Sequence, residues 1–309
     1  MRKEFKNEFS WSFSRDNTFS ECRRKYFYNY YGSWGGWKRD SIDEVTRSLY
    51  VLKNLVNMKI WKGDAVHKEI SRVLKSFETT DSIGSFENSV KRTTRIMRDE
   101  FRFSKAKEYW TTDKSLRKVN ALFEHEYELD VSDEEWIDNY NDVIKCIKNF
   151  YSSEIVEELK SIGCENLITV DSITPTSFDY NGEIVYVNLD LAYKVGDEVK
   201  IVDWKTGTGE SNPLQFVVYV FHTNETLGTP LDKLSVIEYN LQENKQYVHK
   251  FSEQEITEAK DYIDNSMKSM KSCLYDPEEN MADISEFPRT DEDWRCNNCN
   301  FKKICFDLP

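Results

Sequence analysis

The first half of the chain carries hydrophobic residues at helical spacing. In residues 64–77 they recur every three or four positions and predict an amphipathic helix; they are Val66, Ile70, Val73, Leu74 and Phe77. Residues 10–31 are dense in aromatic and basic residues and predict a helix that begins at Ser12 or Ser14. From residue 84 to 160 the pattern stays helical and polar, which predicts a helical insertion or subdomain.

After residue 160 the pattern changes to one typical of strands. Three strands are expected at 166–180, 183–195 and 198–207, and the pairs Asn181-Gly182 and Gly196-Asp197 predict the turns between them. This part of the chain therefore predicts consecutive strands joined by tight turns.

Helices and a further hairpin follow these strands. Pro213 is typical of the first position of a helix. The segments 234–241 and 245–251 predict a hairpin across Glu243-Asn244, and residues 252–273 predict a helix. Together the patterns indicate an α/β fold with a central mixed β-sheet flanked by helices.

The same patterns divide the chain into four parts. Residues 1–60 form an N-terminal helical segment, and residues 61–83 together with 161–275 form the core. Residues 84–160 form the helical insertion, and residues 276–309 form an irregular C-terminal tail.

The composition is that of a globular protein, with 39% hydrophobic and 31% charged residues among 309. No run of eighteen apolar residues is present to cross a membrane, and the N-terminus lacks the apolar stretch of a secretory signal. We therefore expect a cytoplasmic protein without a membrane segment, whose seven cysteines are thiols or metal ligands and not disulfides.

The net charge of −13 is unfavourable for a protein that binds nucleic acid, but the charges are segregated. Between Lys91 and Lys118 ten basic residues stand against four acidic ones, whereas 124–165 and 276–293 are strongly acidic. This distribution permits a basic track on an acidic body. A solvated basic helix face is an equally good interpretation.

Asp190, Asp203 and Lys205 form the most informative cluster of polar residues. Asp203 and Lys205 are two positions apart in an expected strand, so their side chains leave the same face. Asp190 ends an apolar run in the preceding strand, and a hairpin would bring the two carboxylates together. Such a pair needs a cation, and oxygen ligands favour Mg²⁺ or Mn²⁺. By itself, however, Asp-x-Lys in a strand is usually a surface ion pair.

Three motifs in order give this cluster a context. IVDWKTG, which contains Asp203 and Lys205, resembles the central motif of the RecB-like branch of the PD-(D/E)xK nucleases. Upstream, WKGDAVHKEI resembles that family's glycine-three-histidine motif through Gly63 and His67. Downstream, QFVVYVF resembles its glutamine–tyrosine helix; the two residues concerned are Gln215 and Tyr219. The resemblance implies a restriction-endonuclease-like core in residues 61–83 and 161–275.

The resemblance also implies roles for these residues. His67, Asp190 and Asp203 would bind Mg²⁺ or Mn²⁺ together with the main-chain carbonyl of Trp204, and Lys205 would assist catalysis. Gln215 and Tyr219 would line the site and contact the DNA backbone. The family often has glycine two residues before the first aspartate, where this chain has Asn188. A further acid near the metal, Asp171 or Glu183, is left open.

The cysteines suggest a second metal site. Cys296, Cys299 and Cys305 form C-x2-C-x5-C near the C-terminus, and Cys22 lies in SECRRKYFYNYY. This split pattern resembles that of AddB-type and CRISPR-associated RecB-like exonucleases, in which four cysteines hold a [4Fe–4S] cluster. Cys146 and Cys164 are expected to be structural, and Cys273 is left open as another candidate for the fourth ligand. A zinc site with the same four cysteine ligands is the alternative, and the split pattern favours iron–sulfur.

The resemblance therefore implies a metal-dependent DNA nuclease, an exonuclease or DNA-end-processing enzyme, with a structural [4Fe–4S] cluster joining the N-terminal segment to the tail. A helicase, a recombination protein or a CRISPR-adaptation protein would be a suitable partner. Two alternatives remain. One is a catalytically silent DNA-binding or scaffolding subunit with the same fold and a zinc site. The other is a metal-cluster protein unrelated to nucleic acid, in which the motif order arises by chance.

Overall fold

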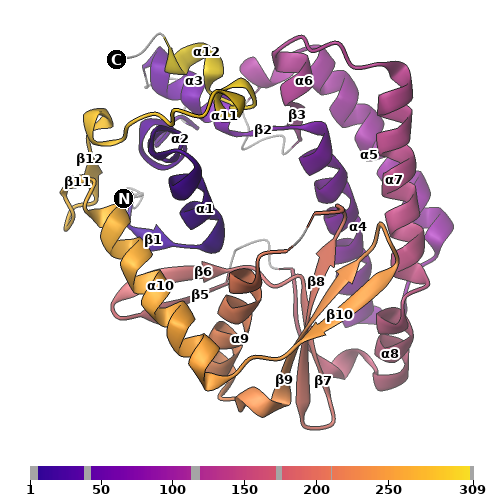
Figure 1. Cartoon of the computed structure of the whole chain (residues 1–309). Helices are drawn as coiled ribbons and strands as arrows, with labels where there is room; N and C mark the ends of the chain where they lie inside the picture. Colours follow the sequence, from indigo (N-terminus) through magenta and orange to yellow (C-terminus); the bar gives the residue numbers. More distant parts are fainter. Residues whose placement is uncertain (1–5, 38–42, 113–118, 172–175, 210, 307–309) are drawn as a thin grey trace, which may run out of the picture.

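The computed structural model describes residues 6–37, 43–112, 119–171, 176–209 and 211–306 (Figure 1). The helices are α1 (Phe13–Glu21), α2 (Arg23–Phe27), α3 (Glu44–Lys53), α4 (Met58–Thr80), α5 (Phe86–Lys105), α6 (Phe123–Glu126), α7 (Asp133–Tyr151), α8 (Glu154–Ile162), α9 (Pro213–Leu227), α10 (Glu253–Lys271), α11 (Asp293–Asn297) and α12 (Lys302–Cys305). The strands are β1 (Ser10–Trp11), β2 (Leu55–Val56), β3 (Ala121–Leu122), β4 (Leu167–Val170), β5 (Thr176–Tyr180), β6 (Glu183–Val187), β7 (Leu191–Val195), β8 (Glu198–Lys205), β9 (Leu234–Asn240), β10 (Lys245–His249), β11 (Leu274–Asp276) and β12 (Met281–Ala282).

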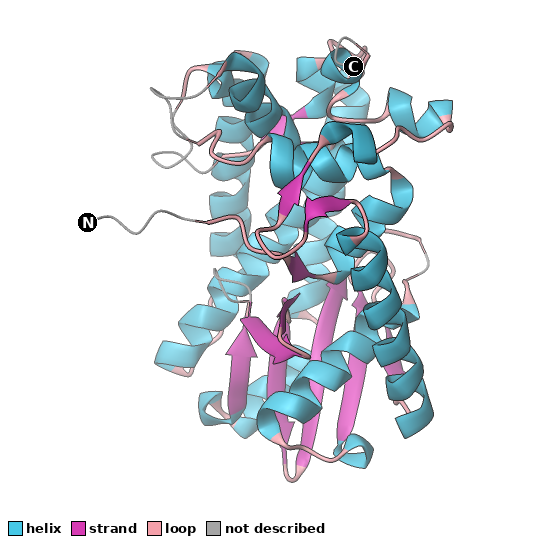
Figure 2. Ribbon diagram, turned by 90° about the vertical axis from the view of Figure 1, so that its left-hand side faces the viewer, coloured by secondary structure: helices cyan, strands magenta, loops and turns pink. Residues whose placement is uncertain are grey.

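A mixed sheet in the order β10-β9-β8-β7-β4 forms the centre of the fold. Strands β8 and β9 are parallel and the other neighbours are antiparallel. Helix α9 connects β8 to β9, as the crossover between parallel neighbours requires. Figure 2 shows the strands gathered mainly in one half of the molecule and helices filling the other half. The expected α/β class with a central mixed sheet and flanking helices is confirmed.

The two faces of the sheet contribute to two different hydrophobic cores. Val199 and Ile201 of β8 belong to the core that contains α9 and α10. Val202 and Trp204 belong to the core that contains α4, α7 and α8. Because side chains alternate along a strand, Asp203 lies on the α9 face, and so does Lys205 two positions later.

Residues 84–160 were expected to form a helical insertion, but their helices pack against the central sheet. Met97 of α5 and Phe150 of α7 share a buried core with Trp204. On α4, the carboxylate of Glu69 is buried and forms ion pairs with Arg72 and with Arg92 of α5. The helices between residues 84 and 160 therefore extend the core of the sheet and also contribute to a third core near the termini.

The C-terminal segment packs on the N-terminal helices (Figure 1). The backbone N–H of Arg24 donates to the Pro288 carbonyl over 3.1 Å, and its Nε donates to the Phe287 carbonyl over 2.7 Å. Phe301 is buried against Tyr28 in the third core. These contacts bring α2, α11 and α12 together although they lie at opposite ends of the sequence.

Two segments that were each expected to form one strand are instead divided into two strands. The segment 183–195 is divided into β6 and β7, which belong to different sheets, and Asp190 lies in the break and not at the end of a strand. The segment 166–180 is likewise divided into β4 and β5, while residues 172–175 lie outside the described residues. In each segment one continuous apolar pattern serves two sheets, because the chain crosses from one sheet to the other within it.

The single helix expected at residues 10–31 is also wrong. Helix α1 does begin after Ser12, whose side chain accepts a hydrogen bond from the backbone of Arg15. It ends at Cys22, because that residue has extended backbone angles (φ −166°, ψ 114°) that a helix cannot accommodate. Its sulfur accepts a hydrogen bond from the backbone of Lys25 and so caps α2, which gives way to a π-helical turn at Tyr28–Gly32.

Other local expectations are confirmed. The helix expected at residues 64–77 is the second part of α4, and α10 begins after Ser252 in a capping box with Glu255. Asn181 and Gly182 both have positive φ at the β5–β6 turn, as a type I′ hairpin requires. Among the described residues, no helix is both long and apolar enough to cross a membrane.

Candidate functional site

The residues expected at a metal centre come from α4, the β6–β7 break, β8 and α9. On α4, His67 lies one turn after Gly63, which approaches the end of β8 closely. A Cβ atom at Gly63 would lie only 3.2 Å from Thr206 Oγ1. The glycine therefore allows the close approach of α4 that brings His67 to the strand ends.

Asp190 connects the helix to the sheet. Its Oδ1 lies 3.2 Å from His67 Nδ1, and its Oδ2 accepts a hydrogen bond of 2.9 Å from the backbone N–H of Trp204. Since Trp204 directly follows Asp203 on β8, this bond holds the two carboxylates beside each other. The hairpin of β7 and β8 pairs Leu191 with Val202 and fixes the same register.

Asp203 belongs to a closed set of contacts with β8 and α9. Its Oδ1 accepts a hydrogen bond of 3.1 Å from the Tyr219 hydroxyl, and its Oδ2 lies 2.8 Å from Lys205 Nζ. Lys205 Nζ donates to Gln215 Oε1 over 3.1 Å, and Gln215 Nε2 donates to the Tyr219 hydroxyl over 2.6 Å. Gln215 and Tyr219 therefore orient both the carboxylate and the lysine.

The charges of the site are those of a cation-binding centre. Burial and the neighbouring Asp190 raise the pKa of Asp203, against the opposing effect of Lys205. Burial lowers the pKa of His67, but the carboxylates of Asp190, Asp203 and Asp171 outweigh it and raise that pKa to about 9. Three carboxylates against the imidazolium of His67 and the ammonium of Lys205 leave a net negative charge, and a divalent cation bound there would take the place of the His67 proton.

The donor set fits a hard divalent cation. Asp203 Oδ2 is buried, and among the described residues its one polar partner is Lys205 Nζ, 2.8 Å away. With an oxygen of Asp190 and the ring of His67, this atom offers the mixed oxygen and nitrogen ligands that Mg²⁺ or Mn²⁺ accepts. The carbonyl of Trp204 stays a predicted ligand.

The two additional acids expected near the metal differ in position. Asp171 lies beside the centre, because its backbone N–H donates to the Asp190 carbonyl over 3.0 Å and its Oδ1 accepts from Asn188 over 3.3 Å. Asn188, at the position where the family often has glycine, therefore supports this acid. Glu183 instead forms an ion pair with Lys271 of α10.

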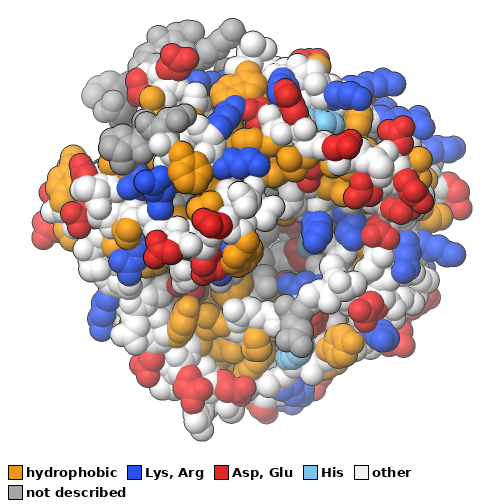
Figure 3. All heavy atoms as spheres, turned by 45° about the horizontal axis from the view of Figure 1, so that its top comes forward, with side chains coloured by type: hydrophobic (Ala, Val, Ile, Leu, Met, Phe, Trp, Pro, Cys, Tyr) orange, Lys and Arg blue, Asp and Glu red, His pale blue; other side chains and the backbone are white. Residues whose placement is uncertain are grey.

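The centre opens into a cavity of about 860 Å³, which also reaches the N-terminal helix. Figure 3 shows a hollow in one face of the molecule with basic and hydrophobic side chains near its edge. Sequence reasoning missed that Arg15 and Tyr30 line this cavity together with Lys205. The only signal was the aromatic and basic pattern of residues 10–31, which does not show which side chains face the centre.

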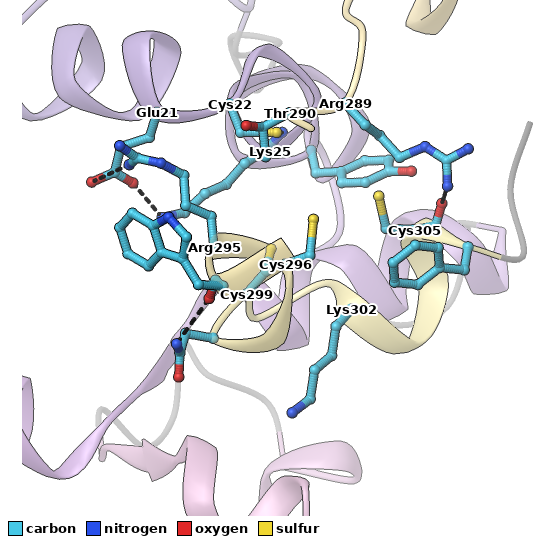
Figure 4. Close-up of a pocket in the computed structure, with 14 residues that line it drawn as sticks. Glu21, Cys22, Lys25, Arg289, Thr290, Arg295, Cys296, Cys299, Lys302 and Cys305 are labelled. Carbon is cyan, nitrogen blue, oxygen red and sulfur yellow. Dashed lines mark hydrogen bonds and ion pairs between the residues drawn. The ribbon is translucent and has the colours of Figure 1, made fainter. Parts of the chain in front are cut away.

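The four cysteines of the second predicted site surround one smaller cavity. Figure 4 shows their sulfur atoms around a common space between α2 and the C-terminal helices. The cavity measures about 130 Å³, and its lining includes Cys22, Cys296, Cys299 and Cys305. The other three cysteines lie outside it: Cys146 and Cys273 are buried, and Cys164 is partly exposed.

This cavity is built to hold anionic sulfur. Burial raises the pKa of Cys299 to about 11, so free thiols are favoured until a metal displaces their protons. Burial also raises the pKa of the Cys305 thiol, and the buried hydroxyl of Tyr28, which lines the same cavity beside this thiol, acts to lower that pKa. Four cations also line it: Lys25, Arg289, Arg295 and Lys302. Lys25 and Arg295 also pair with acids, Glu21 and Glu292, so Arg289 and Lys302 are the cations most available to stabilise thiolates. This hydroxyl and these cations fit a thiolate-bound metal.

One comparison with known proteins identifies a family. The family described as the PD-(D/E)XK nuclease superfamily matches the chain over residues 10–306. This range includes the metal centre and all four cysteines of the second site. No curated protein sequence matches the chain.

Proposed function

We propose that this chain, which belongs to the PD-(D/E)XK nuclease superfamily, is a DNA nuclease that hydrolyses phosphodiester bonds at DNA ends with Mg²⁺ or Mn²⁺. The observation that carries the proposal is the convergence of three separate motifs on one cavity. His67, the Asp203–Lys205 pair and the Gln215–Tyr219 pair all line it, together with Asp190. The RecB-like branch is the part of the superfamily whose motifs the chain resembles.

Each residue of the centre has a distinct task in this proposal. A bound divalent cation would polarise the scissile phosphate and lower the pKa of a water molecule. Asp190 and Asp203 would hold that cation with His67. Lys205 would orient the attacking water or stabilise the charge of the transition state. Gln215 would keep the ammonium group in place through the hydrogen bond already present.

The direct test is incubation of the pure protein with end-labelled single-stranded and double-stranded DNA. Cleavage that requires Mg²⁺ or Mn²⁺ and stops in EDTA supports the proposal. The order in which labelled products appear distinguishes an exonuclease from an endonuclease. Binding of DNA without cleavage under every metal condition would instead favour a catalytically silent subunit.

We further propose that the four-cysteine cavity holds a [4Fe–4S] cluster with a structural role. Each of the four cysteines lines one enclosed cavity, although one comes from the N-terminal segment and three come from the C-terminal tail. This split arrangement supports a larger group to which each cysteine contributes one thiolate, and a tetrahedral zinc ion with the same four ligands is the alternative.

The basic track expected at residues 91–118 forms, within its described part, an exposed stripe on α5. Its members are Lys91, Arg95, Arg98, Arg102 and Lys105, which recur at helical spacing on the outer side of the helix. Arg92 is not part of the stripe, because it pairs with the buried Glu69. Residues 113–118 lie outside the described residues. We propose that the stripe contacts DNA phosphates.

Charge reversal of this stripe should weaken DNA binding. The triple variant Arg95→Glu, Arg98→Glu, Arg102→Glu is expected to reduce the slope of log K against log salt by about 2 to 3, because three phosphate contacts are lost. Fluorescence anisotropy of labelled DNA at several salt concentrations measures the slope. A matched control reverses three exposed lysines elsewhere: Lys148, Lys160 and Lys194. An equal slope in the two triple variants would assign the α5 stripe to a solvated surface.

A further inference from the structure

One wall of the metal-centre cavity carries a cation that the proposed mechanism does not use. Arg15, in the first turn of α1, lines the cavity together with Ser14 and Tyr30. Its guanidinium carbon lies 4.3 Å from the centre of the Tyr30 ring, and its Nη1 donates to the Ser10 carbonyl over 3.1 Å. The guanidinium is therefore held in a fixed orientation at the cavity wall.

No counterion neutralises this arginine within the described residues. In the described part of the chain, no carboxylate oxygen lies within 4.0 Å of a guanidinium nitrogen of Arg15. The adjacent carboxylate of Asp16 is directed elsewhere, since it accepts hydrogen bonds from Tyr262 and Ser266 of α10. A guanidinium has five N–H donors, and a fixed, unneutralised one suits a planar bidentate contact with an anion.

A second cation adds to the positive potential at this place. Lys53, the last residue of α3, donates to the Asn29 carbonyl over 3.1 Å and also lies without an ion pair among the described residues. Burial and the nearby charge of Arg15 lower the pKa of Lys53 to about 8. Two partly buried cations that repel each other are costly unless an anion joins them.

We propose that Arg15, which lines the cavity, forms a phosphate-binding subsite for the DNA strand, to which the nearby charge of Lys53 adds. The subsite rests on the proposed nuclease function. It would hold a phosphate other than the scissile one, because Arg15 reaches the cavity from α1, whereas Asp190 and Asp203, which would hold the metal, come from the β6–β7 break and β8. Arg15 would contact this phosphate directly and fix the register of the strand, and Lys53 would strengthen its binding. Stacking on Tyr30 keeps the guanidinium plane ready for that contact.

Methylphosphonate scanning tests this subsite on the wild-type protein. Fluorescein-labelled DNA, single-stranded in one arm and duplex in the other, carries one neutral linkage at successive positions, and binding is measured in EDTA so that the strand is not cut. We expect one linkage whose neutralisation weakens binding about tenfold, the effect of losing one charge-assisted hydrogen bond. The Arg15→Gln variant should bind unmodified DNA more weakly by about the same factor. Neutralising the sensitive linkage should then cause no further loss of binding by this variant.

Further variants separate charge from packing. Lys53→Met should weaken binding in the same direction, Arg15→Lys should recover part of the loss, and Lys194→Gln on β7 should bind as the wild type does. If Arg15→Gln lowers the unfolding temperature, the scan on the wild-type protein still decides the question. The subsite is wrong if the wild-type scan shows no sensitive linkage, or if the Arg15→Gln variant gives the same scan as the wild type. Arg15 would then be only a packing partner of Tyr30.

The outcomes also separate this subsite from the proposed function. If cleavage requires a metal and Asp203 while the scan is flat, only the subsite is wrong. If the wild-type protein neither binds nor cleaves DNA of either form, the proposed nuclease function fails and the subsite fails with it.

Discussion

Replacement of Asp203 by alanine should reduce DNA cleavage by at least about a thousandfold, because metal-centred charge stabilisation is the largest contribution to this reaction. Asp203 is 4% exposed, and its buried Oδ2 contacts Lys205 Nζ over 2.8 Å. Lys205→Ala should have an effect of similar size, since Lys205 Nζ is the cation nearest that carboxylate. Initial rates on end-labelled DNA with Mg²⁺ measure both effects.

A control within the same hairpin makes this test specific. Asp197 lies at the turn between β7 and β8 and pairs with Lys233 at the surface. Asp197→Ala should keep cleavage near the wild-type rate, because the turn is at the far end of β8 from the metal centre. Wild-type cleavage that persists in excess EDTA, or an active Asp203→Ala protein, would contradict the two-carboxylate centre.

Asp203, which is expected to be essential for cleavage, is not expected to stabilise the fold at neutral pH. Because the folded-state pKa of Asp203 is raised, the folded protein holds a proton there more tightly than the unfolded chain does. Its contribution to stability is therefore full below the unfolded-state pKa and is lost as the pH rises through the folded-state pKa. In EDTA at neutral pH, Asp203→Asn should unfold at a temperature equal to or above that of the wild type. A lower unfolding temperature would show that the ionised carboxylate stabilises the fold.

Replacement of Cys22 by serine should remove the proposed cluster as completely as replacement of Cys299. Both cysteines line one cavity although they lie on opposite ends of the chain. Anaerobically purified wild-type protein should be brown with absorbance near about 400 nm, and the variants should be colourless. Because metal binding energy is partly folding energy, the midpoint of thermal unfolding should fall by about 2–4 °C for each kcal/mol lost.

Cys164→Ser is the matched control for this prediction. Cys164 is also partly exposed, and it lies outside the cavity. Its replacement should leave iron content and colour unchanged. Replacement of the buried Cys146 should likewise leave metal content unchanged. A colourless wild-type protein containing zinc would replace the iron–sulfur proposal by a zinc site with four cysteine ligands. Full iron in Cys22→Ser would show that Cys22 is not a ligand.

Local patterns were sufficient to predict much of the fold. The helical pattern of residues 252–273 predicts α10, and Asn181-Gly182 predicts a hairpin turn, because both signals depend on residues close in sequence. The same patterns failed where one apolar run serves two sheets. Asp190 lies in such a break, and its position depends on the Trp204 backbone and His67, which are distant in sequence.

The sequence alone was enough to predict the α/β class and, through motif order, the residues that meet at the proposed metal centre. Spacing within a motif is short-range information, since two positions in a strand or four in a helix place side chains on one face. The tertiary structure was needed to show that Arg15 lines the same cavity without an ion pair among the described residues, that Lys53 lies close enough to be affected by its charge, that Asp171 lies beside the centre, and that Glu183 does not. These arrangements depend on how α1, α3 and the β6–β7 break pack against one another, and packing between distant segments leaves no periodic signal in a single sequence.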